Sequence, residues 1–152
     1  MNNSLITWLN NEIIRNQHYH NHKETMAWLA TVLYLTGTIT LSSKINGLSS
    51  CDKTLAIILF ILTSVGAYSF ISWQFDNRWK AARKIAALIH TYTLLEANPK
   101  QTIDLTFNKD HALPEFVVKN LPDENLLTDR AFSEFTSYGI MLLALIWFIA
   151  NL

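Results

Sequence analysis

The sequence has little that would support disulfide, metal or nucleic-acid chemistry. It contains a single cysteine, Cys51, so no disulfide can form within the chain, and no second thiol completes a metal site. We expect an inert thiol. Twelve basic and twelve acidic side chains cancel, and this excludes the net positive field that is typical of nucleic-acid-binding proteins. The first residues lack the features of a cleaved secretory signal, so we expect the N-terminus to be retained.

Motifs for catalysis and cofactor binding are also absent. The sequence has no GxSxG, no P-loop, no GxGxxG and no Cys/His arrangement that would activate a nucleophile. His111 and the carboxylates near it could form an acid–base pair, but any solvated loop of this composition offers as much. We therefore predict a protein that is not an enzyme and that carries no cofactor and no metal ion.

The chain is instead rich in long apolar runs. Half of the 152 residues are hydrophobic and 16% are charged, a composition that predicts a small integral membrane protein. Residues 25–43, 54–75 and 133–151 are each long enough to cross a bilayer as a helix. Their central parts contain no charged residue and no histidine, which excludes the buried proton relay of an ion-coupled transporter. Trp28, Trp73 and Trp147 lie near the segment ends, as membrane-interface aromatic residues do.

The distribution of lysine and arginine predicts the orientation. Two of the twelve lie in the N-terminal tail (1–24) and eight in residues 76–132, whereas the loop 44–53 carries Lys44 and Lys53. Because cytoplasmic segments next to a span are enriched in basic residues, we expect the tail and residues 76–132 to face the cytoplasm of a bacterial inner membrane. The loop 44–53 and the C-terminus then lie outside.

No proline or glycine interrupts residues 70–95, so the second span is predicted to continue into a cytoplasmic helix over 76–97. Asn98 and Pro99 end it. One face of this helix carries an apolar stripe at steps of three and four residues: Ala81, Ile85, Leu88, Tyr92 and Leu95. A single small chain cannot fully bury such a stripe, and we therefore predict that it is an oligomer interface.

The cytoplasmic segments on either side of this helix have patterns of their own. In 98–132, Ile103, Leu105 and Phe107 alternate with polar residues as a strand does, and EFVVKN (115–120) is the candidate partner strand of a small hairpin docked on the helix. The tail 1–24 has an amphipathic helical pattern, and could lie in the membrane interface or pack on the long helix. The predicted fold is an all-α membrane protein of one domain with three spans and this small insert.

Three groups of polar residues are candidates for binding or conduction. Hydroxyls in the spans could line a narrow pore or bond their own backbone carbonyls in packed helices: Thr36, Thr40, Thr63, Ser64 and Ser69. Four cations beside the second span could attract lipid headgroups or bind a phosphate-bearing ligand: Arg78, Lys80, Arg83 and Lys84. His18 and His22 share a helical face, but two imidazoles are too few for a metal site. We expect them to belong to the polar side of a cytoplasmic helix at the membrane interface, and a pH-sensing role is the alternative.

Two segments together resemble the SLATT family of small bacterial membrane proteins. They are WLNNEIIRNQHYHNHKETMAWLATVLYL, which leads into the first span, and FISWQFDNRWKAARKIAALIHTY, which leaves the second. The resemblance covers about residues 5–95 and depends on these positions: Trp8, His18, Tyr19, Gln74, Arg78, Ala81 and Ala82. It implies an effector in anti-phage or nucleotide-signalling systems that oligomerises and permeabilises the inner membrane when a sensor triggers it. The third span and residues 98–132 depart from the family arrangement.

Two functions are compatible with these patterns. The first is a homo-oligomeric inner-membrane effector that depolarises the membrane on a cytoplasmic signal, with membrane lipids and a cytosolic sensor as partners. The second is a non-conducting, membrane-anchored adaptor that recruits a cytosolic partner through residues 76–132. No nucleic acid is expected as a partner of either.

Overall fold

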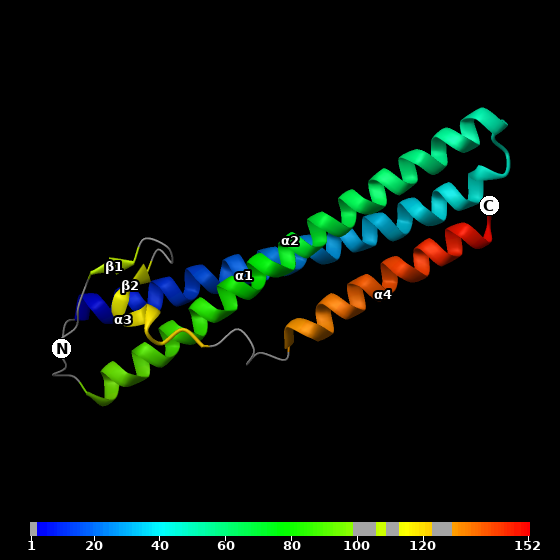
Figure 1. The fold of residues 1–152 in the computed structure, drawn as a ribbon. Helices are drawn as coiled ribbons and strands as arrows, with labels where there is room; N and C mark the ends of the chain where they lie inside the picture. Colours follow the sequence, from blue (N-terminus) through cyan, green and yellow to red (C-terminus); the bar gives the residue numbers. More distant parts are fainter. Residues whose placement is uncertain (1–2, 99–105, 109–112, 123–128) are drawn as a thin grey trace. The chain divides into compact units, whose positions relative to one another are not determined.

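The computed structural model describes residues 3–98, 106–108, 113–122 and 129–152 of the chain. Three long helices, α1 (Asn3–Ile45), α2 (Ser50–Ala97) and α4 (Asp129–Ala150), account for most of them (Figure 1). Two short strands, β1 (Phe107–Asn108) and β2 (Leu113–Pro114), pair antiparallel, and a one-turn helix, α3 (Glu115–Val118), follows β2. The described chain is therefore mainly helical with a small two-stranded sheet, as the sequence predicts.

The three long helices each contain a segment long and apolar enough to cross a membrane. The candidate spans lie within Ser4–Ile45, Ser50–Ala97 and Phe132–Ala150, and the sequence placed a span in each of them. The helix α2 has no interruption between its apolar first half and its polar second half, and it ends at Ala97, beside the predicted stop signal. The prediction of a span that continues as a helix is confirmed for the backbone.

The described residues divide into two compact units, and α1 and α2 contribute to both. We name them the spanning unit (Lys23–Asp76 and Thr128–Leu152) and the tail unit (Met1–His22 and Asn77–Leu127). Each unit has its own cluster of buried apolar side chains.

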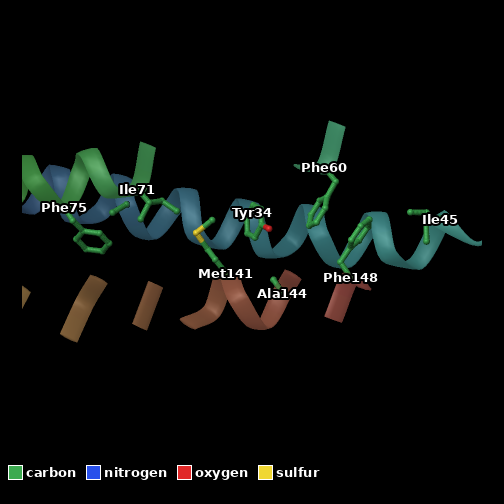
Figure 2. Close-up of a cluster of buried hydrophobic side chains, with 9 residues drawn as sticks. Tyr34, Ile45, Phe60, Ile71, Phe75, Met141, Ala144 and Phe148 are labelled. Atoms are coloured by element: carbon green, nitrogen blue, oxygen red, sulfur yellow. The ribbon is translucent and has the colours of Figure 1, made fainter. Parts of the chain in front are cut away.

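In the spanning unit, burial follows a repeat of alternately four and three residues on each helix. The recurring positions are Ala27, Thr31, Tyr34, Thr38, Leu41 and Ile45 on α1, Phe60, Ser64, Ala67, Ile71 and Gln74 on α2, and Ser137, Met141, Ala144 and Phe148 on α4; Ser42 and Phe75 are also buried beside them. This 3.5-residue repeat is that of helices packed as in a left-handed coiled coil. Side chains of all three helices meet in the cluster drawn in Figure 2, where the rings of Phe60 and Phe148 lie 3.9 Å apart.

Large apolar side chains cover the outside of the spanning unit. Leu62 on α2 and Leu143 on α4 are examples, with 63% and 68% of their surface exposed. Exposed apolar faces of this kind are compatible with helices that cross a membrane, in which apolar side chains need no cover from water.

In the tail unit, the N-terminal part of α1 packs against α2. Leu9, Leu88, Leu113 and Val117 are almost fully buried in one cluster, with Trp8 and Tyr92 at its edge. Two placements of the tail were predicted, in the membrane interface or on the long helix. In the structure the tail packs on the long helix α2.

One prediction is wrong: EFVVKN does not form the second strand of the hairpin. The return strand is Leu113–Pro114, in which Pro114 pairs with Phe107, and EFVV forms α3. Proline has no N–H for a sheet ladder and ends the strand, while its own φ of −60° suits the start of a helix. The carboxylate of Glu115 in the first turn is favourable there. The other predicted strand residues, Ile103 and Leu105, lie outside the described residues.

Candidate functional site

The first candidate site is the basic segment of α2 in the tail unit, which contains Arg78, Lys80, Arg83 and Lys84. Its two arginines have separate partners. The Arg78 Nε–H donates to Nε2 of His20 over 3.2 Å. An arginine is always a donor, so Nε2 is the acceptor and the imidazole proton lies on Nδ1, 3.3 Å from the amide oxygen of Asn21. Arg83 donates through Nε to the backbone carbonyl of Pro122 over 3.0 Å.

The other two cations of this segment differ in exposure. Lys80 is exposed, whereas Lys84 is half-buried. Burial lowers the pKa of Lys84, the positive charge of Arg15 lowers it further, and the carboxylate of Glu12 opposes both effects. Glu12 is itself buried and forms an ion pair of 2.5 Å with Arg15. Arg78 and Arg83 thus bond residues of their own unit.

The apolar stripe of α2 has a partner within the same chain. Ala81, Leu88 and Leu95 are buried, and Ile85 and Tyr92 are half-buried. Leu88 has no exposed surface and lies in the cluster with Leu9 of α1, Leu113 of β2 and Val117 of α3. In this conformation side chains of α1, β2 and α3 therefore pack on the stripe within one chain, and its role as an oligomer interface stays a prediction.

A side-chain network fixes part of this cover on α2. The Asn120 side-chain amide donates to the Thr91 hydroxyl over 3.0 Å and to the Phe116 carbonyl over 3.1 Å. Thr91 in turn donates to the carbonyl of Ala87. The turn after α3 is thereby bonded to the buried face of α2.

The predicted pore or packing hydroxyls all bond their own helix. Each donates to the backbone carbonyl four residues earlier, at 2.8 to 2.9 Å: Thr36 to Val32, Thr40 to Thr36, Thr63 to Leu59, Ser64 to Phe60 and Ser69 to Val65. Of the two alternatives given by the sequence, these hydroxyls therefore have the one in which they form hydrogen bonds to backbone carbonyls of their own helix. Only Ser64 also faces another helix.

Two hydrogen bonds join the spans at positions that the sequence analysis did not single out as pairs. Ser64 donates its proton to Phe60, so the Tyr34 hydroxyl donates to Ser64 Oγ over 2.9 Å and connects α1 to α2. In the same way Thr31 donates to Ala27, and Ser137 donates to Thr31 Oγ1 over 2.6 Å, which connects α4 to α1. In the sequence, these residues could be found as polar residues at positions of the 3.5-residue repeat of buried positions.

An apolar groove lies between α1 and α2 in the spanning unit, with a volume of about 320 Å³. Leu33, Gly37 and Leu41 line it on α1, and Leu59 and Thr63 line it on α2. Sequence analysis did not find it, because a groove depends on how two helices pack.

The described histidines and the cysteine are not grouped as the ligands of a metal ion would be. Within the described ranges, no group of three or more His, Cys, Asp or Glu side chains is placed to hold a metal ion. His18 and His22 are exposed on α1. Cys51 is a free, exposed thiol at the start of α2.

Comparison of the chain with protein-family models, with curated proteins and with solved structures finds no match.

Proposed function

We propose that this chain is a multi-pass effector of the bacterial inner membrane, which assembles into homo-oligomers and depolarises the membrane on a cytoplasmic signal, in defence against phage. The tail unit is cytoplasmic in this proposal, and the loop between α1 and α2 faces outward. The resemblance to the SLATT family supports the activity. The three apolar helices support the location.

The observation that carries the proposal is the cover on the apolar stripe. Leu88 is fully buried beneath Leu9, Leu113 and Val117, and the last two belong to short elements that follow α2 in the sequence. In this conformation the stripe is not available to a second copy. A cytoplasmic signal that displaces β2 and α3 would expose it, and burial of the exposed side chains between copies would then favour assembly, since burial of a leucine contributes about 1.5–3 kcal/mol.

The test is the membrane potential of bacteria during controlled expression of three variants. Val117→Asp places a charge in the cover, and we expect it to depolarise cells more strongly than the wild type. Val117→Asp combined with Ile85→Asp also places a charge on the stripe, and should return the potential toward that of uninduced cells. Lys119→Asp, an exposed position just after α3, is the matched control and should behave as the wild type.

The amount of each variant in the membrane fraction is measured in parallel, so that loss of protein is distinguished from loss of activity. If Val117→Asp reaches the membrane, remains monomeric and leaves the potential unchanged, the proposal of a covered oligomerisation surface fails.

A second candidate function, a non-conducting adaptor, is favoured by one observation. All five candidate pore hydroxyls already donate to their own backbone. An adaptor predicts that expression of every variant is harmless and that a cytosolic protein co-purifies through residues 76–132. Substitution of the exposed Ile89 by Asp should then remove the partner without changing the amount of membrane-bound chain.

A further inference from the structure

We propose that His20 of α1 and Arg78 of α2 form an acid-sensitive contact, which holds the two helices together at neutral pH and is lost in acid. Both residues lie in the tail unit, so the inference holds within one compact unit and does not depend on the proposed function. It is supported by the direction of one hydrogen bond, by the charged groups along both helices and by the burial of the pair.

The hydrogen bond between these side chains requires a neutral imidazole. The Nε–H of Arg78 donates to Nε2 of His20 over 3.2 Å, and a guanidinium has no acceptor, so Nε2 carries a free lone pair. The ring proton lies on Nδ1, 3.3 Å from Oδ1 of Asn21. A second proton on the ring leaves the Asn21 contact in place. It removes the acceptor for Arg78 and places two positive charges opposite each other.

The face of α2 that carries Arg78 has no carboxylate that would offset this repulsion. Residues 74–75, one turn before Arg78, and residues 81–82, one turn after it, are all uncharged. Asp76 and Lys80 lie two positions from Arg78, and side chains at this spacing project from different sides of a helix. From α2, a protonated His20 therefore meets a cation.

On α1 the charged side chains one turn from His20 are Lys23 and Glu24, whereas residues 16–17 on the other side are uncharged. The Lys23 ammonium group lies 5.0 Å from the centre of the Trp73 ring. Glu24 can attract a protonated imidazole along α1, but a carboxylate on the same helix cannot restore the bond to α2. The elements β2 and α3 pack near Leu9, which lies about 16 Å from His20 along α1.

The partial burial of the pair increases the effect. His20 and Arg78 are both half-buried, and charges that are partly buried are screened less by salt than exposed ones. The ordinary pKa of histidine is about 6.5, so an imidazole changes its charge within a range that cells reach. Acid should therefore weaken the attachment of α1 to α2, and neutral pH should restore it.

The experiment is hydrogen exchange of the full chain in detergent micelles, followed by mass spectrometry and corrected for the intrinsic effect of pH on exchange. It compares about pH 7.5 with about pH 5.5, on either side of the ordinary histidine pKa. In the wild type, amides of α1 in residues 16–22 should exchange about threefold faster or more at the lower pH, the effect of losing one hydrogen bond. His20→Gln keeps an acceptor that does not titrate, and should remain protected at both pH values.

His18→Gln is the matched control, because His18 is exposed on the same helix; this variant should keep the acid-induced increase. Arg78→Met removes the donor, and its exchange should be equal at the two pH values even if α1 is less protected at both. Equal exchange of the wild type at the two pH values overturns the proposal. An acid-induced increase that persists in His20→Gln or in Arg78→Met also overturns it, since other groups then cause the increase.

Discussion

Thr31 of α1 and Ser137 of α4 place their hydroxyl oxygens 2.6 Å apart, and both side chains are almost completely buried between the helices. The two residues are separated by 106 positions in the sequence. Because Thr31 gives its own proton to Ala27, Ser137 is the donor, and this bond fixes the register of the third span against the first.

Replacement of Ser137 by alanine should therefore weaken the attachment of α4. Hydrogen bonds between membrane helices contribute about 0.6 kcal/mol on average and up to about 1.7, and we expect a loss of unfolding free energy in that range. The measurement is unfolding of the purified chain in mixed detergent micelles. Thr36→Val, at an exposed hydroxyl that bonds its own backbone, is the control and should change stability less. Equal losses at the two sites would contradict the interhelical role.

Replacement of Leu88 by alanine should destabilise the tail unit. Leu88 has no exposed surface, and deletion of a fully buried leucine side chain costs about 2–5 kcal/mol through lost burial and the cavity that remains. Its neighbour Ile89 is 47% exposed, so Ile89→Ala should cost far less. Hydrogen exchange of the α2 amides, measured by mass spectrometry, reports this difference. Similar protection in both variants would mean that the cover over Leu88 is not formed in solution.

The stability of the tail unit should increase as the solution becomes more alkaline. The pKa of Lys84 is lowered by burial and by Arg15, so the unfolded chain binds its proton more tightly than the folded one does. Protonated Lys84 therefore lowers the free energy of unfolding, and this loss is complete at pH values below the pKa of Lys84 in the folded chain. It is removed as the pH rises from there to the ordinary value of 10.5. Lys84→Met should raise the melting temperature near neutral pH and reduce the alkaline increase.

The control for Lys84 is Lys119→Met, at an exposed position of the same unit. Thermal unfolding followed by circular dichroism over the neutral to alkaline range measures both variants. An unchanged alkaline increase in Lys84→Met would assign that increase to other groups.

The single cysteine provides a direct test of orientation. Cys51 is exposed at the start of α2, and in the topology that we propose from the distribution of basic residues it lies outside the inner membrane. A membrane-impermeant maleimide should therefore label the wild-type chain in cells whose outer membrane has been permeabilised. A Cys51→Ser chain with Gln17→Cys, an exposed position of the N-terminal part of α1, should be labelled only after lysis. The reverse result would invert the proposed topology.

Much of the backbone could be predicted because the controlling signals are local. The spans follow from uninterrupted apolar runs, and the continuation of α2 to Ala97 follows from the lack of proline and glycine before Pro99. The second strand of the hairpin lies earlier in the chain than the predicted EFVVKN, because Pro114, whose missing N–H ends β2, comes directly before it.

The candidate sites were less predictable. Arg78, Arg83 and Lys84 are close in the sequence, and their proximity suggests attraction to lipid headgroups or binding of a phosphate-bearing ligand. Their directions around α2 differ, and each finds another neighbour: His20, the Pro122 carbonyl, and the pair Glu12 and Arg15. A linear pattern shows that cations are clustered but not which internal acceptors lie opposite them.

The sequence by itself determined that the chain is mainly helical, with three helices long and apolar enough to cross a membrane, because hydropathy, helix length and helix-stop residues act within a few turns of the chain. It also determined which face of α2 is apolar. Only the tertiary structure decided what covers that face, since Leu9, Leu113 and Val117 come from three separate elements. It likewise decided that Ser137 meets Thr31 and that a groove stays open beside Gly37. These contacts join helices that are distant in the sequence. They depend on how all the buried side chains of the helices pack together, which a local sequence pattern does not specify.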